Sequence, residues 1–137
     1  MRLVDASVWV AIADPRDRHH SAAHAMVAEV EQPLAALDLT LYEVANVMGP
    51  KKAQPRQGRF LLRLIEERCG ENLVAADADL MESALEIAAE HGITAYDAAY
   101  VAAARRHGWT LVSADIADLV SKGLAVAPDA ADYPSSG

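Results

Sequence analysis

The chain has 137 residues, 53% of them hydrophobic, and a formal net charge of −8. This length suits one domain with a buried core, and the acidity argues against a module that holds nucleic acid by electrostatics alone. No stretch reaches the ~18 apolar residues that a membrane span requires, so no membrane segment is predicted.

Short apolar strands and helices alternate along the chain, and Pro33, Gly49-Pro50 and Gly70 mark ends of elements. The alternation predicts an α/β fold in which helices cover both faces of a parallel sheet of about four to five strands. No linker or repeat divides the chain, so we expect a single domain over 1–128 and a loose tail over 129–137. The expected strands are 2–4, 34–37, 72–76, 109–112 and 124–126, and the expected helices are 7–13, 19–30, 39–48, 58–69, 79–91, 95–107 and 116–120.

Two features of the sequence bear on the compartment. Cys69 is the only cysteine, which excludes an internal disulfide and fits the cytoplasm. Arg2 and the apolar run over 6–13 resemble a secretion signal only faintly, because the run is short and Asp5 interrupts its apolar character. We therefore expect a cytoplasmic protein.

Four acidic residues stand beside predicted strand ends or helix starts. Asp5 follows the first strand, Asp115 follows the strand over 109–112, and Glu43 and Asp97 lie in the first turns of helices. Ligands of open α/β sheets bind outside the carboxyl ends of the strands, so the four carboxylates can meet at one edge. Clustered carboxylates need protons or a cation, and hard oxygen ligands suit Mg²⁺ or Mn²⁺. Such a metal can activate water against a phosphate.

Helix capping is the alternative for each acid taken singly. The segments from Thr40 to Glu43 and from Thr94 to Asp97 match the spacing of a capping box. Asp5 and Asp115 can each be an N-cap, like many aspartates before helices. Spacing alone leaves capping and metal binding both open.

Four motifs span nearly the whole chain: LVDASVWV at 3–10, YEVANV at 42–47, YDAAYVAAA at 96–104 and LVSAD at 111–115. In this order they resemble the motifs of the PIN-domain family. A chain of this length is most similar to the VapC toxins of bacterial and archaeal toxin–antitoxin pairs. The resemblance implies a PIN-like three-layer α/β/α fold and a Mg²⁺- or Mn²⁺-dependent endoribonuclease, a toxin that inhibits translation or growth.

Site residues follow from the same resemblance. It carries Asp5, Glu43, Asp97 and Asp115 over as catalytic acids, and Asp5, Asp97 and Asp115 as metal ligands. Supporting roles fall to Ser7, Asn46, Ser113 and Asp118; for Asp118, one helical turn after Asp115, a solvated surface acid is the alternative.

The densest basic stretch follows the second motif. Gly49-Pro50 interrupts the chain before Lys51 and Lys52, where relatives often continue the helix. A solvated helix face is the simpler interpretation of Lys51, Lys52, Arg56, Arg59 and Arg63, and contact with the RNA backbone is the alternative.

Other conspicuous side chains have structural explanations. The histidines at 19, 20 and 24 lack the acidic partner of a zinc motif, so packing is expected. Trp9 and Trp109 lie in apolar segments and are expected in the core. Arg105 and Arg106 close a predicted helix, where cations complement the helix dipole.

Protein partners are also implied by the family resemblance. It implies an antitoxin that lays a helix or strand over the toxin and pushes a basic side chain into the acidic pocket. It implies a homodimer as well. The acidity of the chain suits a basic partner.

Two rival functions belong to other classes. A catalytically silent binding module could keep this fold, but the presence of all four acids weighs against it. A phosphotransfer domain could use Asp5 as a nucleophile, but Ser7 stands where an Asp-x-Asp motif needs its second aspartate.

Overall fold

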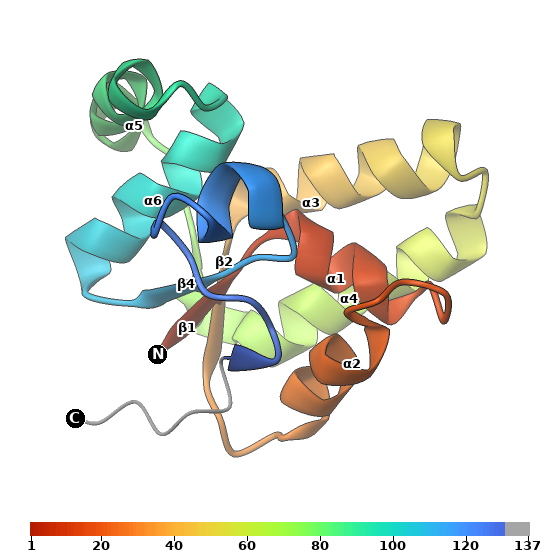
Figure 1. Ribbon diagram of the computed structural model, residues 1–137. Helices are drawn as coiled ribbons and strands as arrows, with labels where there is room; N and C mark the ends of the chain where they lie inside the picture. Colours follow the sequence, from red (N-terminus) through yellow and green to blue (C-terminus); the bar gives the residue numbers. More distant parts are fainter. Residues whose placement is uncertain (131–137) are drawn as a thin grey trace.

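The computed structural model describes residues 1–130 (Figure 1). The predicted tail lies outside the described residues from residue 131 onward. Most predicted helices and strands are confirmed to within one or two residues at their ends. The elements are β1 (Arg2–Val4), α1 (Ala6–Ile12), α2 (His20–Ala28), β2 (Leu34–Leu37), α3 (Asp38–Asn46), η1 (Val47–Lys51), α4 (Pro55–Cys69), η2 (Gly70–Asn72), β3 (Leu73–Val74), α5 (Ala78–His91), α6 (Ala95–His107), β4 (Thr110–Val112) and η3 (Ile116–Val120).

The four strands form one parallel sheet in the order β3-β2-β1-β4. In β1, Arg2 lies opposite Leu34 of β2 on one side and opposite Thr110 of β4 on the other. Since every strand runs in the same direction, their carboxyl ends share one edge of the sheet, where the predicted site residues follow β1 and β4.

Helices cover both faces of the sheet, which confirms the three-layer α/β/α arrangement. Alternate strand residues point to opposite faces, so Leu3 packs in one apolar cluster and Val4 in the other. The Val4 cluster includes side chains of α1, α2 and α4, and the Leu3 cluster includes side chains of α5 and α6. Figure 1 shows α5 and α6 on one side of the strands and α1, α2 and α4 on the other.

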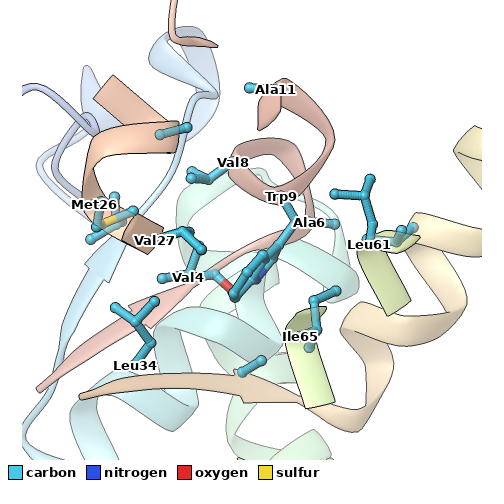
Figure 2. Packing of buried hydrophobic residues seen from close by; sticks show 14 of the residues in the cluster. Val4, Ala6, Val8, Trp9, Ala11, Met26, Val27, Leu34, Leu61 and Ile65 are labelled. Atoms are coloured by element: carbon cyan, nitrogen blue, oxygen red, sulfur yellow. The ribbon is translucent and has the colours of Figure 1, made fainter. Parts of the chain in front are cut away.

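Trp9 anchors the cluster under α1, α2 and α4. Its side chain is fully buried, and its indole Nε1–H donates to the Val4 carbonyl oxygen at 3.3 Å. Figure 2 shows the ring between Val4 and Ile65. The prediction of a core role is confirmed for Trp9, whereas Trp109 is half-buried and stacks on His107 with ring centroids 4.2 Å apart.

The Gly49-Pro50 pair widens the helix instead of ending it, so the prediction of a helix stop there is wrong. Residues 47–51 form a π-helical turn, η1, in which the Lys52 N–H donates to the Val47 carbonyl at 2.9 Å. Proline has no N–H, and its ring clashes with the carbonyl four residues earlier. The backbone hydrogen bonds therefore shift from a spacing of four residues to one of five. Gly49 has no Cβ to clash with Pro50, which lets the turn stay helical.

The predicted strand over 124–126 is also wrong, because only Val126 pairs with β4, through an isolated bridge to Val112. The Leu124 N–H donates to the Leu119 carbonyl at 3.0 Å instead of to a strand. On the other side of the bridge, Pro128 cannot donate to a ladder. Within residues 1–130, no helix combines the length and the apolar character needed to cross a bilayer.

Candidate functional site

A cavity of about 230 Å³ opens where β1 and β4 end. All four acids predicted as catalytic line it. Its other lining residues come from α1, η1 and α6. The full lining is Asp5, Ala6, Ser7, Val10, Glu43, Val47, Asp97, Tyr100 and Asp115.

Asp5 lies at the bottom of this cavity, with 4% of its surface exposed. It is the N-cap of α1: its Oδ1 accepts from the Ser7 N–H at 3.1 Å, the Val8 N–H at 3.4 Å and the Ser7 hydroxyl. Burial raises the pKa of Asp5 to about 6, although hydrogen bonds from the Ser113 and Ser7 hydroxyls lower it. A cation at this carboxylate would relieve the cost of the buried charge.

Two serine hydroxyls join the loop after β4 to the start of α1. The Ser7 hydroxyl accepts from the Ala114 N–H at 2.9 Å and lies 3.4 Å from the Ser113 hydroxyl. The fully buried Ser113 hydroxyl accepts from the Asp115 N–H at 3.0 Å. The two residues predicted to support the site therefore fix Asp5 and Asp115 relative to each other.

Glu43 reaches the cavity from α3. Its Oε1 accepts from the Tyr100 hydroxyl at 2.7 Å. Burial raises the pKa of Glu43, and the hydrogen bond from Tyr100 opposes that rise.

Three carboxylates form a tighter group on one side of the cavity. Oxygens of Asp97, Asp115 and Asp118 all lie within 4.8 Å of one another. Burial raises the pKa of Asp97 to about 6, and the charges of Asp115 and Glu43 add to the rise. Asp5 and Glu43 line the same cavity without belonging to this group.

These donors fit a hard divalent cation. They are carboxylate oxygens, which Mg²⁺ and Mn²⁺ prefer, and their mutual repulsion raises the pKa of Asp97. Asp118 is exposed, and one of its carboxylate oxygens lies within the group.

Two of the four acids both cap a helix and line the cavity. Asp5 caps α1 and Asp115 caps η3, where its Oδ1 accepts from the Asp118 N–H at 3.0 Å. Both caps use Oδ1 of the aspartate. Thr94 caps α6 by accepting from the Asp97 N–H, as predicted.

The predicted capping box from Thr40 to Glu43 is wrong. The helix begins earlier, with Leu37 as its N-cap, so Thr40 lies within its first turn. The Thr40 hydroxyl accepts from the Leu37 N–H at 3.2 Å and lies 2.8 Å from the Tyr100 hydroxyl. Glu43 is therefore free to face the cavity.

The structure does not bring every predicted residue to the cavity. Asn46 is exposed and does not line it. Lys51 and Arg56 are exposed around η1, and the Lys52 ammonium pairs with the Asp14 carboxylate at 3.5 Å. This ion pair joins the end of η1 to the loop after α1. Asp14 follows Val10, which lines the cavity, by four residues.

Several other basic residues and histidines have structural contacts. Arg63 pairs with Glu66 at 3.2 Å and Arg106 with Asp77 at 3.6 Å. His20 Nδ1 lies 2.9 Å from the Ala11 carbonyl oxygen, as a packing role requires. Within residues 1–130, the histidines belong to no group of three or more potential metal ligands.

Sequence reasoning missed Tyr100, which lines the cavity and binds Glu43. A signal was present, because Tyr100 follows Asp97 by three residues and shares its helix face. Its alanine-rich surroundings resemble a plain core helix, which hides the hydroxyl.

Comparisons with known proteins agree with this architecture. A sequence model of the PIN domain matches residues 2–118. The chain is 36% identical over 124 residues to Ribonuclease VapC3 of Pyrobaculum aerophilum, an alignment that covers 82% of this chain and 88% of that protein.

Two solved structures share the fold. Mycobacterium tuberculosis VapC20, described as a sarcin-ricin loop cleaving toxin, has a TM-score of 0.69 and 21% identity over 90% of this chain and 95% of that one. A toxin–antitoxin complex from Klebsiella pneumoniae has a TM-score of 0.68 and 21% identity over 93% of this chain and 98% of that one.

Proposed function

The chain belongs to the PIN-domain family, and on that premise we propose that it is a metal-dependent endoribonuclease and the toxin of a toxin–antitoxin pair. The observation that carries the proposal is the single cavity lined by Asp5, Glu43, Asp97 and Asp115. Ribonuclease VapC3, at 36% identity, supports the choice of RNA as the substrate class. Cleavage of RNA would inhibit translation or growth, and we propose the cytoplasm as the compartment.

The proposed reaction is hydrolysis of a phosphodiester bond. A water oxygen attacks phosphorus, the bond to the leaving oxygen breaks, and the leaving oxygen takes up a proton. Mg²⁺ or Mn²⁺, when bound, would activate the water and neutralise charge on the phosphate. Asp97 and Asp115 would hold the cation, with Asp118 beside them and Asp5 at the floor.

Glu43 is suited to the proton transfers of this reaction. Its carboxylate lines the cavity outside the group of three aspartates, and burial raises its pKa toward neutral pH. A carboxylate of this kind can take the proton of the attacking water. Ser7 and Ser113 would keep Asp5 and Asp115 in register during the reaction.

The substitution Asp5→Asn tests the proposal. An asparagine at this position would still cap α1 through its amide oxygen, so the fold should remain while RNA cleavage falls at least about 100-fold. Purified protein is incubated with total RNA and Mg²⁺ or Mn²⁺, then with a chelator, and the cut ends are mapped. Asp79→Asn, at an exposed acid of α5, is the matched control.

Retained cleavage in folded Asp5→Asn protein would refute the site. A catalytically silent binding module would show no cleavage by the unaltered chain. It would also show no stabilisation against heat by Mn²⁺, which a carboxylate site should provide.

An apolar groove separate from the acidic cavity is our proposed surface for the antitoxin. It lies between α1, α2 and α4 and has a volume of about 420 Å³. Phe60 and Val30 line it with 60% and 75% of their surfaces exposed, which is unusual for large apolar side chains. Arg68 holds one wall by donating to the Val27 and Gln32 carbonyls at 2.8 and 3.0 Å.

A further inference from the structure

A chain of buried hydroxyls runs from the end of β2 to the cavity. It begins at the Leu37 N–H, passes through the side chains of Thr40 and Tyr100, and ends at Glu43. The three distances are 3.2, 2.8 and 2.7 Å. We infer that Tyr100 and Thr40 are positioning residues, a hydrogen-bond relay that holds the Glu43 carboxylate in place for the proposed ribonuclease reaction.

The direction of every hydrogen bond in the relay is fixed while Glu43 is ionised. The Leu37 amide can only donate, so the Thr40 oxygen accepts. An ionised Glu43 can only accept, so the Tyr100 hydroxyl donates its single hydrogen to the Glu43 carboxylate. The Thr40 hydroxyl must then donate to the Tyr100 oxygen, and each bond polarises the next.

Burial makes this relay the main restraint on Glu43. Tyr100 is 1% exposed and Thr40 fully buried, so water does not compete for either hydroxyl. Asp5 accepts from three donors in its own helix start, whereas within residues 1–130 the hydrogen bond recorded for the Glu43 carboxylate comes from Tyr100. A glutamate side chain has several rotatable bonds, so one fixed donor decides where its carboxylate points.

The relay also joins elements that would otherwise hold Glu43 only from one side. Thr40 and Glu43 are one turn apart on α3, and Tyr100 comes from α6 across the sheet edge. Asp97 lies on the same helix, three residues before Tyr100. The relay therefore fixes the distance between the helix that carries Glu43 and the helix that carries Asp97.

Two substitutions remove the relay without changing the shape of the core. Tyr100→Phe deletes one hydroxyl, and Thr40→Val replaces a hydroxyl by a methyl group. We expect each to lower kcat for RNA cleavage about 10- to 100-fold with little change in KM, as loss of an orienting partner does. Thr40→Ser keeps the hydroxyl and should recover most of the lost rate.

A double variant separates positioning from loss of stability. In a Glu43→Gln background, Tyr100→Phe should cost little further rate, because the relay acts through Glu43. Val101→Ala is the structural control, since Val101 is a buried neighbour on α6 outside the relay and the cavity. It should lower the melting temperature and leave cleavage below that temperature unchanged.

The outcomes distinguish failure of the relay from failure of the proposed function on which it rests. If the unaltered chain does not cut RNA, the proposed function fails. If the unaltered chain cuts RNA and Tyr100→Phe cuts within twofold of its rate, the relay is overturned. Crystal structures of the unaltered chain and the Tyr100→Phe chain give a readout independent of cleavage: an unmoved Glu43 carboxylate would overturn the relay.

Discussion

At the scale of single residues, burial decides the chemistry of the acids. Asp5 and Asp97 have pKa values raised to about 6, mainly because the fold removes them from water. A carboxylate with such a pKa exchanges a proton for a cation near neutral pH. The same property gives a test that needs no RNA.

The metal-free protein should lose stability as pH rises from about 4 to above 6. Between the unfolded pKa of 3.8 and the folded pKa of about 6, the folded chain keeps a proton on Asp5 that the unfolded chain releases. Stability therefore falls as pH rises through this window, by up to about 3 kcal/mol for Asp5. Thermal unfolding in chelator at a series of pH values measures it.

Asp5→Asn serves as the control for this pH dependence. It should make the curve less steep, because the amide does not titrate, whereas Asp97 still titrates in the same window. Addition of Mn²⁺ should restore stability above pH 6 in the unaltered chain. An unchanged slope in Asp5→Asn would show that other groups cause the pH dependence.

The sequence predicted the acids and serines of the cavity but not the hydroxyl relay. Asp5 directly follows β1 and Asp115 comes three residues after the end of β4, so their motifs locate them without knowledge of packing. Tyr100 binds Glu43 across the gap between two helices, and no local pattern reports the distance between α3 and α6. The supporting role predicted for Asn46 stays a prediction, since that side chain is exposed.

At the scale of elements, the π-helical turn η1 sets how closely α4 can approach. Met48 is buried in this turn, and Gly58 of α4 packs against it. A Cβ placed on Gly58 would lie 2.8 Å from the Met48 Cβ. This atom is attached directly to the backbone, so it cannot rotate away.

We therefore expect Gly58→Ala to destabilise the protein. Overpacking costs about 1–3 kcal/mol, which outweighs a gain of about 1 kcal/mol in helix propensity. The midpoint of thermal unfolding should fall by a few degrees. Gln57→Ala, at the exposed neighbouring position, should change it little. A Gly58→Ala protein more stable than the unaltered chain would contradict the close approach.

Elements with complete local signals were predicted well, and those that depend on backbone pairing were not. The helix over 95–107 was found with those bounds, because Thr94 caps it and Gly108 ends it in the left-handed region. The apolar residues at 124–126 resemble a strand, yet the Leu124 amide bonds to the turn before it. The turn after Asn46 resembled a helix end because proline usually interrupts the hydrogen bonds of an α-helix. No local sequence pattern predicts that these hydrogen bonds instead change to π-helical spacing.

At the scale of the whole molecule, the apolar groove proposed for the antitoxin shares no lining residue with the acidic cavity. Phe60→Asp places a charge in the groove, among side chains that do not line the acidic cavity. It should weaken the complex with the proposed antitoxin by about 30-fold or more. Calorimetry with purified antitoxin measures the loss.

Leu85→Asp makes the same chemical change on α5 and should leave antitoxin binding intact, since Leu85 is exposed outside the groove. Equal weakening by both substitutions would refute the groove as the binding surface.

Homodimerisation stays a prediction, and light scattering that detects only a 14.6 kDa particle at high concentration would contradict it.

The position of β1 inside the sheet governs when activity can arise during synthesis. β1 is translated first, but the Asp5 N–H that follows it bonds to Val112 and the Ser7 hydroxyl to Ala114, which emerge from the ribosome much later. An unfinished chain therefore lacks Asp97, Asp115 and one partner strand of β1, and should not damage RNA near the ribosome. The side chains of the apolar groove, by contrast, are all translated before Asp97. The proposed antitoxin surface is thus translated before two of the four acids of the cavity.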